Sequence, residues 1–224
     1  MKKTTLLFSL LLYALIASAQ FNEILDKQLH TLQVTVNGDP LLPPIINLGG
    51  RNHVEISFDE FSHEYHRYIY KVEHCNADWT PSVGIFESDY MNGFNGEPIE
   101  DYEKSFNTTV LYTHYSLRIP NENISLKLSG NYKLTVYNDE GDEPVPVLTA
   151  CFSLVEPGVS IGATVSSNTD IDFNKSHQQL NFSVHFGDIK VVDPHRELKT
   201  VVMQNRRHDN CVFNPVPNIR AAGK

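Results

Sequence analysis

The amino-acid sequence predicts an all-β protein built from antiparallel strands. Apolar and polar residues alternate through most of the chain, which is the pattern of a strand with one buried face. Turn sequences rich in Gly, Asn and Pro separate these segments. Parallel sheets need a crossover, usually a helix, between strands, and only residues 22–32 have a brief helical pattern. About nine strands are expected, at Leu32–Val36, Val54–Phe58, Tyr68–His74, Val110–Ile119, Tyr132–Val136, Leu148–Leu154, Val159–Val165, Leu180–Phe186 and Leu198–Met203.

Residues 28–156 are expected to form an immunoglobulin-like or fibronectin III-like antiparallel β-sandwich. The segment Ser129–Tyr137 combines a turn, an inward-facing Tyr132 and strict alternation. This is typical of the penultimate strand of such a sandwich, whose tyrosine hydroxyl bonds back to the preceding corner. The acidic residues 139–143 suit the tip of the hairpin that leads into the last strand.

The sequence Glu156–Gly158 predicts a hinge into the start of a second β domain, residues 157–224. Three expected strands would leave one sheet face and two edges uncovered. We therefore expect this second domain to be incomplete, either because the chain is a fragment or because something else completes it.

The N-terminus has the organisation of a cleaved signal peptide, residues 1–19. A basic start, Met1–Lys3, precedes the apolar run Leu6–Ile16 and the small-residue sequence Ala17–Ala19. As a helix, the apolar run would span only about 16 Å, against about 30 Å for the hydrocarbon core of a bilayer. Export with cleavage after Ala19 is expected, and no later segment is apolar enough to cross a membrane.

Charge excludes two classes of partner. The chain has 27 acidic and 18 basic residues, a net charge of −9, and loss of residues 1–19 would leave 16 basic residues and a net charge of −11. A chain this acidic is repelled by nucleic acid and by anionic lipid. Disorder as the main state is excluded as well, because 41% of the residues are hydrophobic.

No catalytic, cofactor or metal site is expected. The sequence Gly158–Gly162 has the G-x-S-x-G spacing of a hydrolase elbow, but Ser160 lies in a strand pattern without the required following helix. His63 and His66 lie three residues apart, a spacing that could hold a metal ion on a helix, but they fall in an expected loop, and His74 falls at a strand end. We expect a protein that is not an enzyme.

Three cysteines, Cys75, Cys151 and Cys211, cannot all pair within one chain. The strongly apolar residues around Cys151 fall on the opposite face of the expected strand. An outward-facing Cys151 is therefore expected.

Residues 75–105 form an expected long loop that is unusually rich in aromatic residues. Loops of this length are usually functional or disordered, and the aromatic content argues against disorder. We expect the aromatic residues to contact a protein partner, with Asp101 and Glu103 as an acidic rim. Alternatively, the rings only close the end of the sandwich. The candidate aromatic contacts are Trp79, Phe86, Tyr90 and Phe94.

The same region carries a resemblance to a known family. Strings of uncommon polar and aromatic residues follow one another in the order seen in the type IX secretion system plug proteins of Bacteroidota, which this chain resembles from about residue 30 onward. These strings are His74–Trp79, Asp89–Phe94, Ile99–Tyr102, Ser105–Thr109, Tyr112–Tyr115, Pro120–Asn123, Ser129–Tyr132, Val155–Ser160 and Val202–Asn205. The sequence departs from the family pattern at 206–208 and 211–213, and family members are longer than this chain.

The resemblance implies a periplasmic, non-enzymatic protein that associates with the outer membrane without inserting into it. Its partner would be the giant outer-membrane translocon β-barrel (SprA-type) of the type IX system, whose inner end it would seal. No cofactor, metal or nucleic acid is implied. The alternative interpretation is a secreted carbohydrate-binding or accessory β-sandwich module, because sugar sites stack their rings on exposed aromatic side chains.

Overall fold

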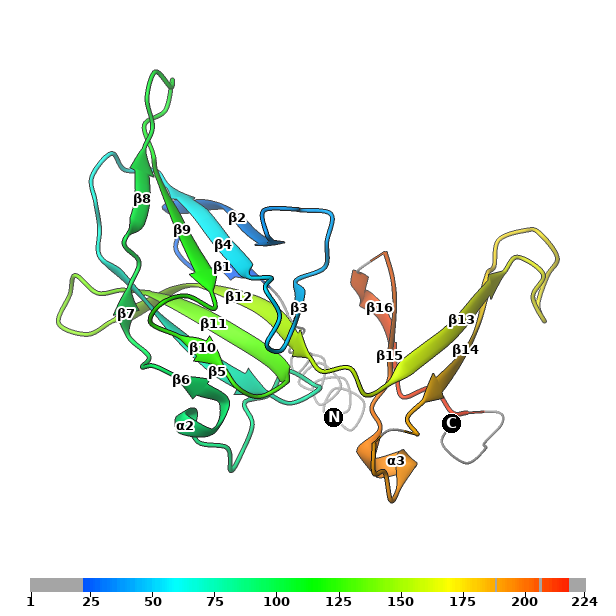
Figure 1. The fold of residues 1–224 in the computed structure, drawn as a ribbon. Helices are drawn as coiled ribbons and strands as arrows, with labels where there is room; N and C mark the ends of the chain where they lie inside the picture. The colour runs from blue at the N-terminus through cyan, green and yellow to red at the C-terminus, as the bar shows by residue number, and fades with distance from the viewer. Residues whose placement is uncertain (1–21, 188, 206, 218–224) are drawn as a thin grey trace, which may run out of the picture. The chain divides into compact units, whose positions relative to one another are not determined.

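The computed structural model describes residues 22–187, 189–205 and 207–217 (Figure 1). The expected signal peptide, residues 1–19, lies outside the described residues. The chain divides into two compact units between Glu156 and Pro157, and each unit is described by itself.

The first unit consists of two main sheets. One sheet has four strands in the order β2-β4-β9-β8, namely Leu29–Val36, Val54–Glu60, Thr113–Ile119 and Asp101–Lys104. The other has the order β1-β12-β11-β5-β7, namely Glu23–Ile24, Val145–Val155, Gly130–Asn138, Tyr68–Cys75 and Glu97–Pro98, with β3 (Ile45–Asn47) parallel to β12. A small separate sheet joins β6 (Met91–Asn92) to β10 (Ser125–Leu126).

The all-β class is confirmed. The described helices are two single turns, α2 (Glu87–Tyr90) and α3 (Pro194–Glu197), and every strand pair other than β3–β12 is antiparallel among the described residues. We interpret the first unit as immunoglobulin-like because β2, β4, β9 and β8 correspond in order to strands A, B, E and D. The strands β5, β11 and β12 correspond to C, F and G of the opposite sheet.

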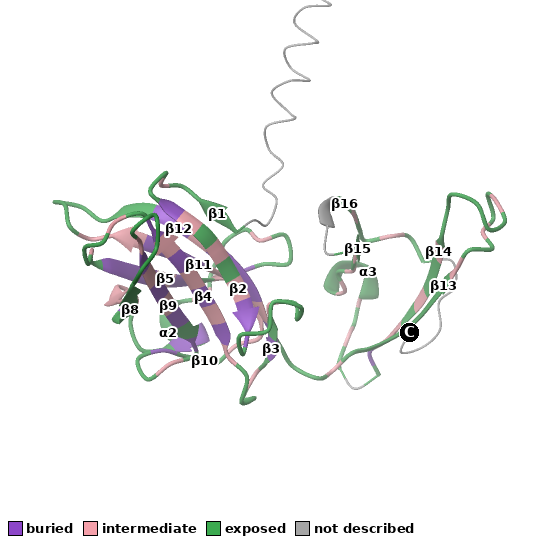
Figure 2. Ribbon diagram, turned by 90° about the horizontal axis from the view of Figure 1, so that it is seen from above, coloured by how far each residue is buried: buried purple, intermediate pink, exposed green. Residues whose placement is uncertain are grey.

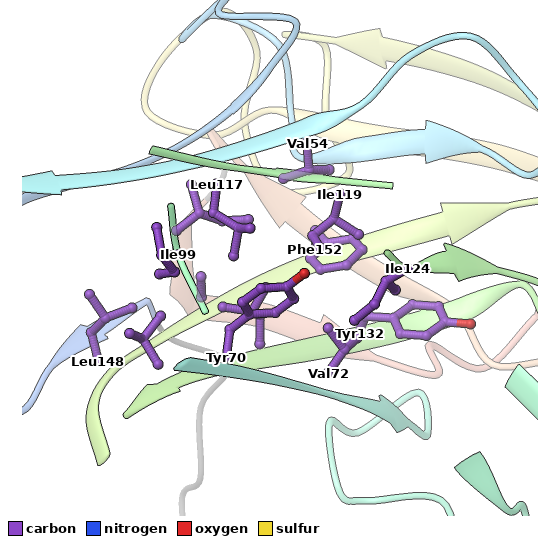
Figure 3. Packing of buried hydrophobic residues seen from close by; sticks show 14 of the residues in the cluster. Val54, Tyr70, Val72, Ile99, Leu117, Ile119, Ile124, Tyr132, Leu148 and Phe152 are labelled. Carbon is purple, nitrogen blue, oxygen red and sulfur yellow. The ribbon is translucent and has the colours of Figure 1, made fainter. Parts of the chain in front are cut away.

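The core of the first unit lies between its two sheets (Figures 2 and 3). Residues alternate between buried and half-buried along β4, as expected for a strand with one core face. Tyr132 and Phe152 stack with ring centroids 5.5 Å apart. The Tyr132 hydroxyl donates a hydrogen bond to the Leu128 carbonyl oxygen, which confirms the expected tyrosine corner. Each large apolar side chain buried here contributes roughly 1.5–3 kcal/mol.

The segment with the brief helical pattern, residues 22–32, is not helical. It contains β1 and the start of β2, joined by a turn in which the Gln28 amide donates to the Asp26 carboxylate at 2.9 Å. The physical reason is that β12 and β4 offer backbone partners to this segment. A helix this short is marginal in water without tertiary support.

Cys151 is buried, so the expectation that it faces outward into solvent is wrong. It does lie on the face opposite the core, where it pairs with Lys133 of β11. However, Asn22, which directly precedes β1, contacts this part of β12, and the Cys151 amide donates to the Asn22 side chain at 2.8 Å. Burial raises the pKa of the Cys151 thiol to about 11. Cys75 lies on β5, across β11 from Cys151 and two residues out of register, so the two Cα atoms are at least about 10 Å apart, beyond the reach of a disulfide.

The second unit contains two separate hairpins. One pairs β13 (Ser160–Ser166) with β14 (Gln179–His185), and the other pairs β15 (Val201–Gln204) with β16 (Arg207–Phe213). The three expected strands are present, and β16 was not expected. Among the described residues of this unit, only one hydrophobic side chain, Phe186, is buried. The described part of this unit therefore has almost no core of its own.

Candidate partner-binding surface

The expected aromatic loop, residues 75–105, is folded rather than irregular. It contains α2, β6, β7 and β8, and it carries the chain from one sheet to the other. Strand β7 extends the edge of β5, and β8 extends the edge of β9. Its aromatic side chains are therefore held by separate elements with different environments.

The segment begins with a tight turn that holds Trp79. The Asn76 amide donates to the Thr80 carbonyl oxygen at 2.8 Å, and the Trp79 amide donates to the Asn76 carbonyl oxygen at 3.0 Å. Hydrogen bonds from Thr80 lower the pKa of the Asp78 carboxyl below its ordinary value. Trp79 has a positive φ of 65°, a left-handed conformation that is strained for a large side chain, and it is half-buried. The turn therefore fixes the only tryptophan without exposing it fully.

A side-chain network anchors this turn to the sandwich. His74 lies 2.8 Å from the Ser82 hydroxyl through Nδ1 and 3.1 Å from the Ser129 carbonyl oxygen through Nε2. The Asn131 side chain donates to the Asn76 carbonyl oxygen at 3.1 Å. The sequence string His74–Trp79 is therefore a structural unit that packs against the Tyr132 corner.

The helix α2 turns Phe86 and Tyr90 in opposite directions. The Phe86 amide donates to the Asp89 carboxylate at 2.8 Å, and the Phe86 side chain is 73% exposed. Tyr90, one helical turn later, is 7% exposed, and its hydroxyl donates to the Val72 carbonyl oxygen at 2.9 Å. The prediction that Tyr90 contacts a partner is therefore wrong, because its ring fills the end of the core beside Tyr132.

Phe94 is exposed because its two neighbours are held by the sandwich. The Asn95 side chain accepts from the Val72 amide at 2.6 Å and donates to the Val72 carbonyl oxygen, so it replaces a strand at the edge of β5. Gly93 has a φ of +100°, and a Cβ there would lie 2.0 Å from the Asn123 carbonyl oxygen. Phe94 itself is 77% exposed.

We call Phe86 and Phe94 the α2 surface. The two residues lie on linked segments, because Glu87, next to Phe86, accepts a hydrogen bond from the side chain of Asn95, next to Phe94, at 2.9 Å. Two exposed aromatic rings held on hydrogen-bonded backbone can bury apolar area on a partner with little loss of conformational entropy.

The predicted acidic rim does not border the α2 surface. Asp101 and Glu103 are exposed on β8, at the opposite end of the first unit from α2 (Figure 1). They line a shallow polar hollow of about 210 Å³ on the outer face of the four-stranded sheet. Arg118 and His114 in this hollow are already paired with Glu55 and Asp59, at 3.5 and 2.7 Å.

Sequence reasoning missed a second exposed apolar group, beside these acids. Phe106, Val110 and Leu111 lie in the loop between β8 and β9 and are all exposed. The alternation that starts at Val110 suggested a strand, but β9 begins only at Thr113. Asn107, with a positive φ of 55°, is the turn residue that could have located the loop.

The described residues contain no arrangement typical of catalysis or metal binding. Ser160 lies in β13 without a following helix. Within the described ranges, no three His, Cys, Asp or Glu side chains are grouped to hold a metal ion. In the β13–β14 loop, Ser176 and Asp172 both approach the same nitrogen of His177, so they cannot form a proton relay through the ring.

Comparison with known proteins identifies the family. Residues 29–156 match the family described as type 9 secretion system plug protein, 1st domain. The chain belongs to the type 9 secretion system plug protein family. The matched segment runs from β2 to β12, and it contains the α2 surface and the β8–β9 hairpin.

A solved structure resembles most of this plug-family chain. It is a hypothetical protein from Parabacteroides merdae, 45% identical over 91% of this chain, with a TM-score of 0.85. The alignment covers 51% of that protein, so the plug-family chain spans about half the length of its relative. A Pseudomonas fluorescens alkylpurine DNA glycosylase, AlkC, bound to DNA with an abasic site analogue, is 13% identical over 57% of this chain and 30% of its own. Its TM-score of 0.27 is too low for any argument. No curated protein sequence matches the chain.

Family membership associates the plug-family chain with type 9 secretion and thereby with the cell envelope. Neither α2 nor α3, the helices of the described ranges, is long and apolar enough to cross a membrane.

Proposed function

We propose that this chain is a non-enzymatic periplasmic plug. It docks on the inner end of the SprA-type outer-membrane barrel of the type 9 translocon and seals the pore. The observation that carries the proposal is the family match over residues 29–156. Export through the signal peptide, residues 1–19, would deliver the mature chain to the periplasm.

The physical properties of the first unit support this role. Sealing an aqueous pore requires a rigid body that fills space and does not open, and it requires no chemistry. The strands of the first unit enclose a continuous core, and the Tyr132 hydroxyl ties one of its corners by a part-buried hydrogen bond. The mature chain is strongly acidic, which favours solubility over adsorption to anionic lipid.

We propose the α2 surface as one contact with the barrel, together with Trp79 on the turn that precedes it in the sequence. Exposed aromatic side chains on a preorganised backbone are typical of residues that dominate binding energy. Replacing Phe86 and Phe94 by Ser should weaken barrel binding at least about tenfold. The matched control is Phe173→Ser, an exposed phenylalanine of the second unit, which should leave binding unchanged.

The test of the proposal combines a deletion strain with a pull-down of the full-length protein. A strain without the gene should admit small hydrophilic dyes through the outer membrane, and the tagged wild-type chain should recover the translocon barrel in mild detergent. A deletion strain that stays impermeable, together with a pull-down without the barrel, would refute the proposed function.

The carbohydrate-binding alternative loses part of its basis in the structure. It depended on a platform of exposed rings, whereas Tyr90 is buried and Trp79 is half-buried. A glycan array probed with the wild-type chain and with Trp79→Ala tests it directly. A glycan bound by the wild type and lost in Trp79→Ala would favour this alternative.

A further inference from the structure

The hairpin formed by β8 and β9 projects from the first unit at the end opposite α2 (Figure 1). We call its loop, residues 106–111, the finger tip. Three of the six residues are large and apolar, with Phe106 86% exposed and both Val110 and Leu111 more than half exposed. Single exposed apolar residues are normal on a protein surface, but a concentration of them in one projecting loop marks an interaction site.

Hydrogen bonds close the finger tip at its base and join two of its residues. The Ser105 amide donates to the Tyr112 carbonyl oxygen, and the Tyr112 amide donates back to the Ser105 hydroxyl, both at 2.9 Å. The Thr108 hydroxyl donates to the Val110 carbonyl oxygen at 2.7 Å. The apolar side chains are therefore displayed on an ordered loop, and docking them loses little conformational entropy.

The base of the hairpin is fixed to the sandwich as well. The Thr113 hydroxyl donates to the carbonyl oxygens of Ser62 and Glu64, at 2.8 and 3.1 Å. The rings of Tyr65 and Tyr102 pack with centroids 4.6 Å apart. The hairpin is thus a rigid projection of the domain.

Negative charge lines the hairpin below the finger tip. Four acids are exposed here, and Lys104 of β8 is an exposed cation beside them. Arg118 and His114 of the neighbouring β9 are already paired with Glu55 and Asp59. The four acids are Glu64, Glu100, Asp101 and Glu103. Asp101 and Glu103 make no ion pair with any residue of the described ranges. These carboxylates are available to pair with cations of a partner.

The negative charge of the hairpin favours one of three possible partners of the apolar tip: a membrane, a second copy of this chain, or another protein. Loops that insert into membranes are favoured by basic residues, which attract anionic lipid, and the acids here would be repelled. A second copy of this chain would bring the same acids together. An apolar cleft bordered by Lys and Arg on another protein would bury the apolar side chains of the tip and pair with the acids on the hairpin.

We propose that the finger tip is a second docking element, at the opposite end of the first unit from the α2 surface, which inserts into such a basic-rimmed apolar cleft. The identity of the partner rests on the proposed function: the protein that carries this cleft is the translocon barrel. Phe106 is the anchor, Val110 and Leu111 widen the buried area, and Asp101 and Glu103 pair with the cations of the rim.

The test measures binding of the full-length chain to purified translocon barrel. Phe106→Asp and Leu111→Asp should each weaken binding at least about tenfold. Leu41→Asp, an exposed leucine of the β2–β3 loop, is the matched control and should bind like the wild type. Thermal unfolding of each variant should match that of the wild type, because the replaced side chains are exposed.

A charge test follows the acidic flank. The double variant Asp101→Lys with Glu103→Lys should weaken binding at low salt, and the difference should shrink as salt rises. Glu143→Lys, on the exposed β11–β12 turn, is the control and should have little effect.

The outcomes separate this inference from the proposed function. If the wild type binds the barrel and Phe106→Asp binds equally well, the finger-tip inference is wrong while the proposed function stands. If the wild type does not bind the barrel, both fail. Binding to phosphatidylglycerol vesicles that Phe106→Asp abolishes would overturn the inference in favour of a membrane. Dimerisation that Phe106→Asp abolishes would overturn it in favour of a second copy of the chain.

Discussion

The carboxylate of Glu60 forms an ion pair with the imidazole of His66, with 2.7 Å between Oε1 and Nδ1. Glu60 is 2% exposed at the end of β4, and the Tyr115 hydroxyl donates to its second oxygen at 3.3 Å. A buried carboxylate without a partner is strongly unfavourable. This pair therefore decides how the β4–β5 connection, which also supports the base of the finger tip, responds to pH.

Stability should fall as pH rises through the range where His66 loses its proton. The contact with Glu60 raises the pKa of His66 above 6.5, outweighing the lowering by partial burial, and Glu140 at 4.0 Å adds to the rise. A pKa that is higher in the folded chain means that the protonated ring stabilises the fold. This stabilisation is complete below pH 6.5 and is lost as pH rises through the folded pKa.

Urea unfolding at pH 6 and pH 8.5 checks this prediction. His66→Ala should destabilise the protein by about 1–3 kcal/mol at pH 6, because it leaves Glu60 without its cation while the exposed part of the pair is screened by solvent. The cost should be smaller at pH 8.5. An equal cost at both pH values would show that the pair contributes no proton-linked stability.

Gly93→Ala should destabilise the first unit by at least about 2 kcal/mol. The new Cβ would meet the Asn123 carbonyl oxygen at 2.0 Å, in addition to the strain of a φ of +100°. Gly84→Ala is the control for φ alone, because Gly84 has a φ of +83° with no atom within 4 Å of its virtual Cβ. Equal losses in the two variants, measured by thermal unfolding, would contradict the close approach of β6 to Asn123.

Tyr132→Phe should cost about 1 kcal/mol of unfolding free energy, because it removes the part-buried hydrogen bond to the Leu128 carbonyl oxygen. Tyr137→Phe is a suitable comparison, since the Tyr137 hydroxyl makes no hydrogen bond with a residue of the described ranges and the ring keeps its contact with Lys71 in the variant. If Tyr132→Phe is no less stable than Tyr137→Phe in chemical denaturation, the tyrosine corner contributes no stability.

Residues 157–224 should not fold alone. We propose that this segment forms only part of a β domain, because β13 and β14 make an isolated hairpin and only Phe186 is a buried hydrophobic among its described residues. Two-stranded hairpins are marginal in water without further strands. Residues 22–156 expressed separately should give a cooperative urea transition, and residues 157–224 should give none. A cooperative transition for the isolated 157–224 segment would contradict the proposal.

The strand pattern was predictable where one face of a strand meets the core and the other meets solvent. Val54, Ile56 and Phe58 follow this rule along β4, and Tyr132 takes the corner position that its turn and alternation indicate. Cys151 contradicted the expectation because it is buried although it lies on the face opposite the core, and its amide bonds to Asn22, a residue distant in the sequence. Period-two alternation identifies the face of a residue but not what covers that face.

The partner-binding residues were harder to predict because composition does not say which ring of an aromatic segment turns inward. Phe86 and Tyr90 lie in the same short segment, yet Phe86 is exposed and Tyr90 is buried. The Phe86 amide, which donates to Asp89, begins the helical turn that lies between them. Asp101 and Glu103 are near Phe94 in sequence but lie at the other end of the domain. The reason is that the intervening β7 runs antiparallel along the edge of β5 and carries the chain away from α2. Phe106 was missed because its loop runs into the alternating residues Val110–Ile119, whose pattern predicts a strand.

The central claim is that the chain closes a pore, and conductance measures this most directly. Purified translocon barrel in a planar bilayer should give a large steady conductance, and the full-length chain added from the periplasmic side should reduce it to near baseline. Phe86→Ser with Phe94→Ser should require a higher concentration for the same block. An unchanged conductance at saturating concentrations of the wild-type chain would contradict the account.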